Sequence, residues 1–424
     1  MITKSSDGVR NSHRSHLAYL FLSIFAASWC ASAKPAKAGD NSSRISNGLY
    51  QMIIRPSYAH RQKKFERMEN SIRGLLVYQM PNGRLVGKSE EIIATISSQK
   101  RPASVSFVNQ VGVDVLLASK IAMRAVKLRY PDLQSRCVRF SFSNQYVIVD
   151  GNSIGCSLAI LMLSLLENTR LDRKVAITGA VTSDWRVRAV GGLEAKIDGA
   201  IQDHLDAVVV PKANARSISD VMVLDGPQTA WQIEIFSTSN LIQAMSMMRY
   251  NKPRDVNYAM LLFDSLKRRF KKDGIEALKN PVVIKRLTDI VALAPNDLSS
   301  RYLLAFAAGK ERKKLSIGAS LYEVFADTQI YDDYLWNQPP PNTPLLKTDV
   351  LASLRQLGNL EKIISPKCLP LVEALRGFVR VCGSWAGTPT GSQHIYASRL
   401  GVLTALNRLG RDKKAIDRIM RSGF

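Results

Sequence analysis

The sequence has 424 residues, of which 46% are hydrophobic and 22% are charged, and its formal net charge is +24. A chain of this length and composition can bury one or two apolar cores, which excludes a largely disordered protein. The positive charge is interpreted as a solvated basic surface, with attraction to an anionic membrane, cell wall or nucleic acid as the alternative. Because no stripe of basic residues interleaved with aromatic ones is present, we expect no specific nucleic-acid partner.

The first 33 residues have the pattern of an export signal. Lys4, Arg10 and Arg14 precede a mostly apolar run at 17–27, and Ala31-Ser32-Ala33 matches the small-residue cleavage site of such signals. The apolar stretch is short for a membrane span, so a cleaved signal is favoured and a retained N-terminal membrane anchor is the alternative. We therefore expect the protein in a bacterial periplasm or secreted.

The next segments divide into a basic lead-in at 34–70 and a folded domain at 71–250. A helix is expected at 113–130, where apolar residues recur at helical spacing. The tripeptide Pro81-Asn82-Gly83 is a hairpin signal. Strands are expected at 72–79, 84–89, 92–97, 104–109, 138–142 and 146–149.

A serine lies on a glycine-flanked turn in Asp150-Gly151-Asn152-Ser153-Ile154-Gly155. The almost wholly apolar run at 156–166 follows, which predicts a buried helix with the serine at its N-terminus. In that position the Ser153 hydroxyl is held out of the helix, near backbone N–H groups that can stabilise an oxyanion. For Asp150, we favour a role in capping the serine helix over a role in orienting the turn.

A lysine follows 43 residues later in Gly191-Gly192-Leu193-Glu194-Ala195-Lys196, with Thr178-Gly179 between the two motifs. A lysine that is partly buried loses its proton more readily and can serve as the base for a serine. The Thr178 hydroxyl is expected to fix the amine by a hydrogen bond. A helix should continue from the lysine to residue 204, followed by a buried strand at 207–210.

These three motifs, in this order and spacing, resemble the proteolytic domain of the Lon proteases. That family has Asp-Gly-Pro-Ser-Ala-Gly at its nucleophile, Thr-Gly after it, and Gly-Gly-Leu-Lys-Glu-Lys ending in its catalytic lysine. The resemblance covers about residues 71–250 and implies an α+β fold, a mixed sheet with packed helices. It further implies that Ser153 is the nucleophile, Lys196 the catalytic lysine and Thr178 its support.

The chain departs from the family pattern at several positions near the serine. Asn152 replaces a proline, Ile154 an alanine, and Ala180 an acidic residue after Thr-Gly. Arg139 and Ser141 stand where the family has histidines. None of these changes removes the serine or the lysine, so they bear on substrate preference more than on mechanism.

The region at 254–424 has an all-α pattern, with a possible break at the proline-rich stretch 337–344. Full-length Lon proteins carry an ATPase module, but this sequence has no Gly-x4-Gly-Lys-[Ser/Thr] phosphate-binding motif. A helical region that binds a protein partner or presents substrate is favoured, and a homo-oligomer is left open. Helices are expected at 256–272, 282–294, 298–308, 348–357, 369–382, 399–409 and 413–420.

No cofactor or metal ion is expected, because there is no Cys-x-x-Cys and the histidines are scattered. Four cysteines remain after signal cleavage, and Cys368–Cys382 is the nearest plausible disulfide in an oxidising compartment. Cys156, inside the serine helix, is expected to be buried and inert.

Two functions are compatible with this sequence. The first is an exported, ATP-independent serine endopeptidase that uses a Ser–Lys dyad on peptides or unfolded proteins. The second is a non-catalytic binding or scaffold protein that retains a Lon-like domain. The intact serine and lysine favour the enzyme.

Overall fold

The computed structural model describes residues 68–79, 85–98, 103–144, 148–336, 345–384 and 389–410. The chain divides into two units, Met1–Lys63 and Lys64–Phe424, and the described residues all lie in the second. The predicted signal, most of the lead-in, the hairpin turn, the stretch 337–344 and the helix at 413–420 lie outside the described residues. Within them, no helix combines the length and apolarity needed to cross a membrane.

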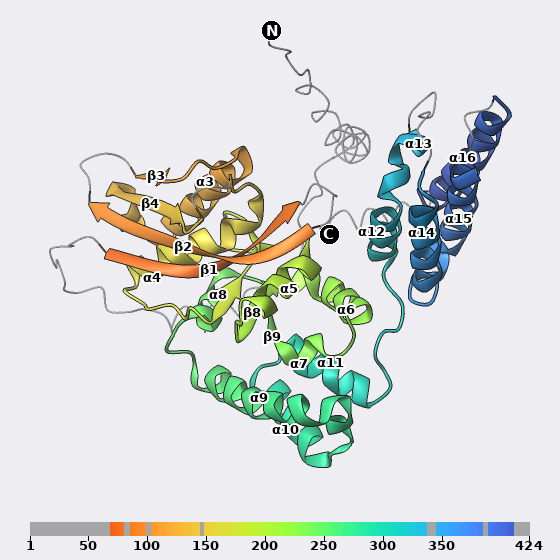
Figure 1. Cartoon of the computed structure of the whole chain (residues 1–424). Coiled ribbons are helices and arrows are strands. Elements are labelled where there is room, and N and C mark those ends of the chain that lie inside the picture. The colour runs from red at the N-terminus through yellow and green to blue at the C-terminus, as the bar shows by residue number, and fades with distance from the viewer. Residues whose placement is uncertain are drawn as a thin grey trace, which may run out of the picture. The chain divides into compact units, whose positions relative to one another are not determined.

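The central element of the described chain is a seven-stranded mixed sheet with the order β3-β4-β2-β1-β5-β8-β9 (Figure 1). β1, β2 and β4 are antiparallel neighbours, whereas β5, β8 and β9 continue from β1 in parallel. A second sheet pairs two short strands, β6 and β7. The strands are β1 Met68–Gln79, β2 Leu85–Ser98, β3 Ser104–Phe107, β4 Arg136–Phe142, β5 Val175–Ile177, β6 Ala180–Val181, β7 Val187–Arg188, β8 Ala207–Pro211 and β9 Glu234–Thr238.

Strand β2 joins two strands that the sequence predicts separately, at 84–89 and 92–97. Glu90 and Glu91 interrupt the apolar pattern there, yet the Glu90 side chain is buried within the strand. Its carboxylate accepts hydrogen bonds from the Ser143 hydroxyl and the Asn144 N–H, which offsets the cost of burying it. The strand therefore runs through the charged pair unbroken.

Helices cover both faces of the β1–β2 pair. A Cβ on Gly74 would approach Ile154 and Ser157, whereas one on Gly87 would meet the backbone of Ala195. Gly87 pairs with Val77 across the two strands, and Val77 lies three residues from Gly74, on the opposite face. The helix after the serine and the helix that carries the lysine therefore pack against opposite faces.

In the part of the chain that forms the sheet, the structure contains the helices that the sequence predicts from long apolar patterns. The helix predicted at 113–130 ends at Lys127, and the lysine helix ends at Gln202 rather than at residue 204. Three further helices, at 215–224, 229–232 and 241–248, were not predicted. The helices are α3 Val113–Lys127, α4 Gly155–Leu166, α5 Leu193–Gln202, α6 Ala215–Leu224, α7 Thr229–Gln232 and α8 Leu241–Met248.

Helices follow from residue 254 onward, so the predicted mixed sheet with packed helices and an all-α C-terminal region is confirmed. The apolar core around the sheet continues through the first three of these helices to Leu303, and a second core extends from Leu315 to Leu409. The helices are α9 Arg254–Asp273, α10 Pro281–Leu293, α11 Leu298–Ala307, α12 Ile317–Asp327, α13 Asp332–Trp336, α14 Lys347–Leu360, α15 Leu369–Ser384 and α16 Pro389–Gly410. The division at about residue 250 remains a prediction.

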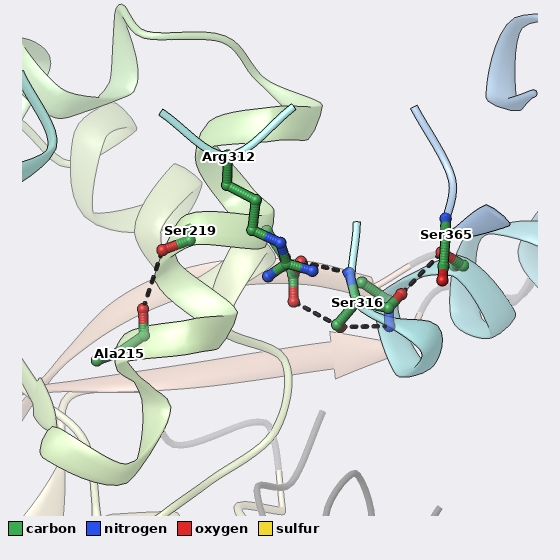
Figure 2. A network of polar contacts seen from close by, with 8 residues as sticks. Ala215, Ser219, Arg312, Ser316 and Ser365 are labelled. Atoms are coloured by element: carbon green, nitrogen blue, oxygen red, sulfur yellow. Dashed lines mark hydrogen bonds and ion pairs between the residues drawn. The ribbon is translucent and has the colours of Figure 1, made fainter. Parts of the chain in front are cut away.

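A buried carboxylate joins α6 to the beginning of the second core. Asp220, which is 3% exposed, accepts hydrogen bonds from the Ser316 N–H at 2.7 Å and the Ser316 hydroxyl at 2.6 Å. Arg312 Nη1 lies 3.0 Å from the same carboxylate, and Figure 2 shows Arg312 and Ser316 converging at this point. Because Ser316 also caps α12, the link fixes where that helix begins.

The predicted disulfide is wrong. Cys368 and Cys382 are both buried free thiols, as is Cys156. Burial raises the pKa of Cys368 to about 11 and that of Cys382 to about 12, so both thiols are protonated at neutral pH. Each belongs to the apolar packing of the second core.

Candidate active site

Ser153 lies in a 3₁₀ turn, Asn152–Ile154, immediately before α4. Gly151 opens the turn with a φ of +109°, a conformation that L side chains rarely adopt. The Ser153 carbonyl accepts a hydrogen bond from the Gly179 N–H, and the Cys156 N–H donates to the Gly179 carbonyl, both at 2.8 Å. The serine turn is thereby fastened to the backbone just beyond β5.

The order of the elements places the serine and the lysine at one edge of the sheet. Helix α4 directly precedes β5 in the chain and runs antiparallel to it, so the start of α4 lies at the carboxyl end of β5. The two hydrogen bonds to Gly179 hold it there. α5 connects β5 to the parallel strand β8 and therefore begins at the same edge. Ser153 precedes α4, and Lys196 is in the first turn of α5. The fold thus brings both predicted residues to the carboxyl edge of β5.

The Lys196 side chain is buried, with 4% of the residue exposed. Its amine donates a hydrogen bond of 3.0 Å to the Gly191 carbonyl. Burial disfavours the charged ammonium and lowers the pKa of Lys196 from 10.5 to about 8. A substantial fraction of this amine is therefore neutral slightly above neutral pH, as a base requires.

The backbone of α5 is held tightly against β2 and β1. A Cβ on Gly87 would lie 1.7 Å from the Ala195 carbonyl oxygen, and a Cβ on Gly192 would lie 2.9 Å from Val77 Cγ2. Gly192 also has a φ of +65°, which favours glycine. Larger residues at Gly87 or Gly192 would displace the first turn of α5, where Lys196 lies.

Thr178 is fully buried at the end of β5, and its N–H donates to the Val209 carbonyl of β8 at 3.1 Å. The predicted hydrogen bond between its hydroxyl and Lys196 is not formed. Among the described residues the Thr178 hydroxyl has no hydrogen-bond partner, because the Lys196 amine is directed to the Gly191 carbonyl. The threonine thus lies at the correct edge without making the expected contact.

Asp150 caps a different helix from the predicted one. Its Oδ1 accepts hydrogen bonds from the N–H groups of Asp114 and Val115 in the first turn of α3, and from Gly151 in the serine turn. A parallel bridge between Val111 and Val149 brings the two segments together. Asp150 therefore fastens the serine turn to α3 and does not cap α4.

Sequence reasoning missed Asn214, the residue before α6. Its side chain accepts a hydrogen bond from the Val190 N–H at 2.9 Å and donates one to the Val190 carbonyl at 3.0 Å. Asparagine before a helix is normally interpreted as a cap, so the sequence carries no signal for a contact 24 residues away. No group of three or more His, Cys, Asp or Glu residues in the described part of the chain is arranged to hold a metal ion.

A serine on a tight turn and a buried lysine of lowered pKa at one sheet edge are features of a serine peptidase site. Residues 118–239 match the family model of the Lon protease (S16) C-terminal proteolytic domain. The resemblance drawn from the three motifs is therefore confirmed, and the match supports a serine peptidase.

Curated Lon proteases are similar to the same part of the chain. The archaeal Lon protease of Thermoplasma acidophilum is 28% identical over 197 residues, which are 44% of this chain and 29% of that protein. That of Thermococcus kodakarensis is 28% identical over 40% of this chain and 27% of its own length. The Lon protease of Rickettsia bellii is 30% identical over 28% of this chain and 15% of its own. The matches thus span less than a third of each relative.

Proposed function

We propose that this chain is a serine endopeptidase in which Ser153 is the nucleophile and Lys196 is the general base. The observation that carries the proposal is the buried Lys196 amine, whose pKa is lowered to about 8, at the sheet edge where the serine turn lies. A lysine with a free amine near neutral pH can accept the proton of a serine hydroxyl. Ser153 is only half-buried, so a substrate can reach it.

The reaction follows from these two groups. The neutral Lys196 amine takes the proton of the Ser153 hydroxyl as its oxygen attacks the peptide carbonyl carbon. The resulting ammonium returns the proton to the leaving nitrogen as the C–N bond breaks, which leaves an acyl ester on the serine. Water then attacks the ester carbonyl carbon and gives a proton to Lys196. The bond from this carbon to the Ser153 oxygen breaks, the Lys196 ammonium returns the proton to that oxygen, and the carboxylic acid product leaves.

The oxyanion formed in both steps needs nearby N–H donors. The N–H of Gly155 donates to the Asn152 carbonyl, and that of Cys156 donates to the Gly179 carbonyl. We therefore assign oxyanion binding to the N–H groups of Ser153 and Ile154 at the start of the turn. Both groups belong to the same short turn as the proposed nucleophile, close to where an oxyanion would form.

Export and ATP independence are also part of the proposal. The pattern of residues 1–33 supports a periplasmic or secreted protein, away from the usual ATP pool, and the sequence has no phosphate-binding loop. Without ATP-driven unfolding, the substrates are peptides and unfolded proteins. The helical region from residue 254 would bind a partner or present substrate.

One observation favours a second function, a non-catalytic binding protein. The Thr178 hydroxyl is unpaired among the described residues, and the Lys196 amine is engaged by the Gly191 carbonyl. In a protein without turnover, the lysine bond would serve only to close the Gly191-Gly192 turn. The covalent-labelling experiment below separates the two functions.

The test combines a fluorophosphonate serine probe with hydrolysis of a fluorogenic peptide library, each measured with and without ATP and Mg²⁺. We expect labelling at Ser153, loss of labelling and turnover in Ser153→Ala and Lys196→Ala, and no response to ATP. Because nucleophile and base act as a unit, the double variant should be little worse than either single one. Ser246→Ala on α8 and Lys285→Ala on α10, which change the same residue types away from this turn, should behave as the wild type. A Lys196→Ala variant with substantial activity would overturn the role of the lysine.

A further inference from the structure

Asn214 occupies the N-cap position of α6 but does not cap that helix. An asparagine there usually accepts a hydrogen bond from an N–H of the first helical turn. In this chain the side chain makes no such bond, and both ends of its amide bind Val190 instead, at 2.9 and 3.0 Å. Asn214 is fully buried and Val190 is 3% exposed, so water does not compete for these bonds. The amide thus binds the backbone of Val190 on both sides.

Val190 directly precedes the turn that holds the lysine. The next residue, Gly191, provides the carbonyl that accepts the Lys196 amine. A Gly-Gly turn has no side chains of its own to restrict its backbone. The close approach of Gly192 to Val77 fixes the turn on one side, and the Asn214 amide fixes it on the other. The Asn214 amide thus holds the peptide that leads into Gly191.

Helix α6 gives Asn214 a rigid base. At the other half of this helix, Asp220 holds Ser316 and Arg312 through the buried link described above. In Figure 2 the Ser219 hydroxyl of the same helix donates a hydrogen bond to the Ala215 carbonyl. The Ser365 N–H donates to the Ser320 hydroxyl, which in turn donates to the Ser316 carbonyl. Asn214 is therefore attached to an element that both apolar cores hold in place.

We propose that Asn214 is a positioning residue for Lys196, which it orients through Val190 and the Gly191 carbonyl. The inference rests on the proposed function for the identity of the lysine as the base. The amide of Asn214 keeps the Gly191-Gly192 turn closed over the Lys196 amine, so that the amine stays buried and directed at the Gly191 carbonyl. Loss of the amide would release the turn and admit water to Lys196.

The charged groups around α5 do not account for the state of the lysine. Glu194 and Asp198 on the same helix interact with Asp225 at the end of α6, and Glu194 also interacts with Glu323 of α12. Burial alone lowers the pKa of Lys196. A change that hydrates the turn should therefore raise this pKa toward its ordinary value.

The experiment titrates the lysine itself and needs no turnover. Full-length protein carrying ¹³C-labelled lysine is followed by NMR, and the Lys196 signal is assigned by its absence in Lys196→Met. Asn214→Ala removes both bonds to Val190, whereas Asn214→Ser introduces an uncharged residue that is favoured before a helix and should fold even if Asn214→Ala does not. Asn280→Ala is the matched control, because Asn280 also precedes a helix, caps α10 and has no link to the lysine.

We expect a Lys196 pKa near 8 in the wild type and in Asn280→Ala, and a value at least one pH unit higher in Asn214→Ala and in Asn214→Ser. The pH at which kcat/KM is half-maximal should move by the same amount. An unchanged Lys196 titration in both Asn214 variants would overturn the positioning role. If the titration shifts but the wild type cleaves no peptide, the proposed function fails and the link from Asn214 to Lys196 stands.

Discussion

The Ser153 carbonyl accepts a hydrogen bond from the Gly179 N–H, so the serine turn is joined to the residue that follows Thr178. Thr178 is thereby held at the carboxyl end of β5, fully buried, with its hydroxyl unpaired among the described residues. A buried hydroxyl without a partner costs free energy and calls for an explanation. Our explanation is that the hydroxyl receives the Lys196 amine during turnover, when the serine proton has been transferred.

This explanation makes Thr178→Val informative, because valine has nearly the same shape and removes only the hydroxyl. Turnover should fall by about 10-fold or more, since a positioned base contributes roughly 10²–10⁴ to the rate. The free energy of unfolding should stay the same or rise, because no existing hydrogen bond is lost. Kinetics on a small peptide together with thermal unfolding check both parts. Full activity in this variant would leave Thr178 as a strand-end residue only.

The sequence predicted those parts of the fold whose local pattern and tertiary setting agree. The apolar run after Ser153, for example, is buried on all sides as α4. The split of β2 was a wrong prediction because Glu90 is stabilised by Ser143 and Asn144, which lie more than 50 residues away. Local pattern carries no information on such distant partners.

The same limit explains the errors at the site. The sequence predicts that Asp150 caps the helix that follows it, but the Val111–Val149 bridge brings the start of α3 within hydrogen-bonding distance of its carboxylate. The sequence gives no sign of the Asn214 contact, because its partner Val190 contributes only backbone atoms, which every residue has. Residue type can reveal a candidate nucleophile or base, whereas the contacts that orient it depend on how the chain folds back.

The Asp220 link predicts that Asp220→Asn will loosen the second core from α6. The variant retains an acceptor for the Ser316 N–H but leaves Arg312 without its charge partner. Unfolding should become easier by about 1–3 kcal/mol, the usual range for a broken buried polar contact. Thermal unfolding measures this loss, and limited proteolysis should show new cleavage at 308–316. Asp289→Asn, the same change at an exposed site on α10, is the control. Equal stability of the two variants would contradict the link.

Export predicts a mature N-terminus at Lys34, after the Ala31-Ser32-Ala33 site. N-terminal sequencing of the protein isolated from its native host measures this directly. Ala31→Asp and Ala33→Asp, which block the small-residue positions, should leave the signal uncleaved. An intact Met1 in a membrane fraction would favour the anchor, and a full-length cytoplasmic protein would refute both.

The lowered pKa of Lys196 predicts an alkaline activity profile. Only the neutral amine can accept the serine proton, and burial places the pKa at about 8. The rate on a small, uncharged peptide should therefore rise about 10-fold per pH unit below this value and level off above it. Steady-state kinetics between pH 6 and 10 check the profile. A flat profile over this range would mean that Lys196 is not the base.

The same pKa must appear in the stability of the protein, which gives an independent check on the profile. The folded pKa of about 8 lies below the ordinary 10.5, so the unfolded chain binds more protons between these values. Unfolding free energy therefore rises with pH through this window: the cost of burying the ammonium is fully present below pH 8 and is gone above 10.5. Relative to Lys196→Met, in which every other group titrates as before, the wild type should gain on the order of 3 kcal/mol between pH 7 and 10.5. Denaturant titrations of both proteins across this range measure the difference. A constant difference would place Lys196 in water in the folded chain, and the alkaline profile would then need another base.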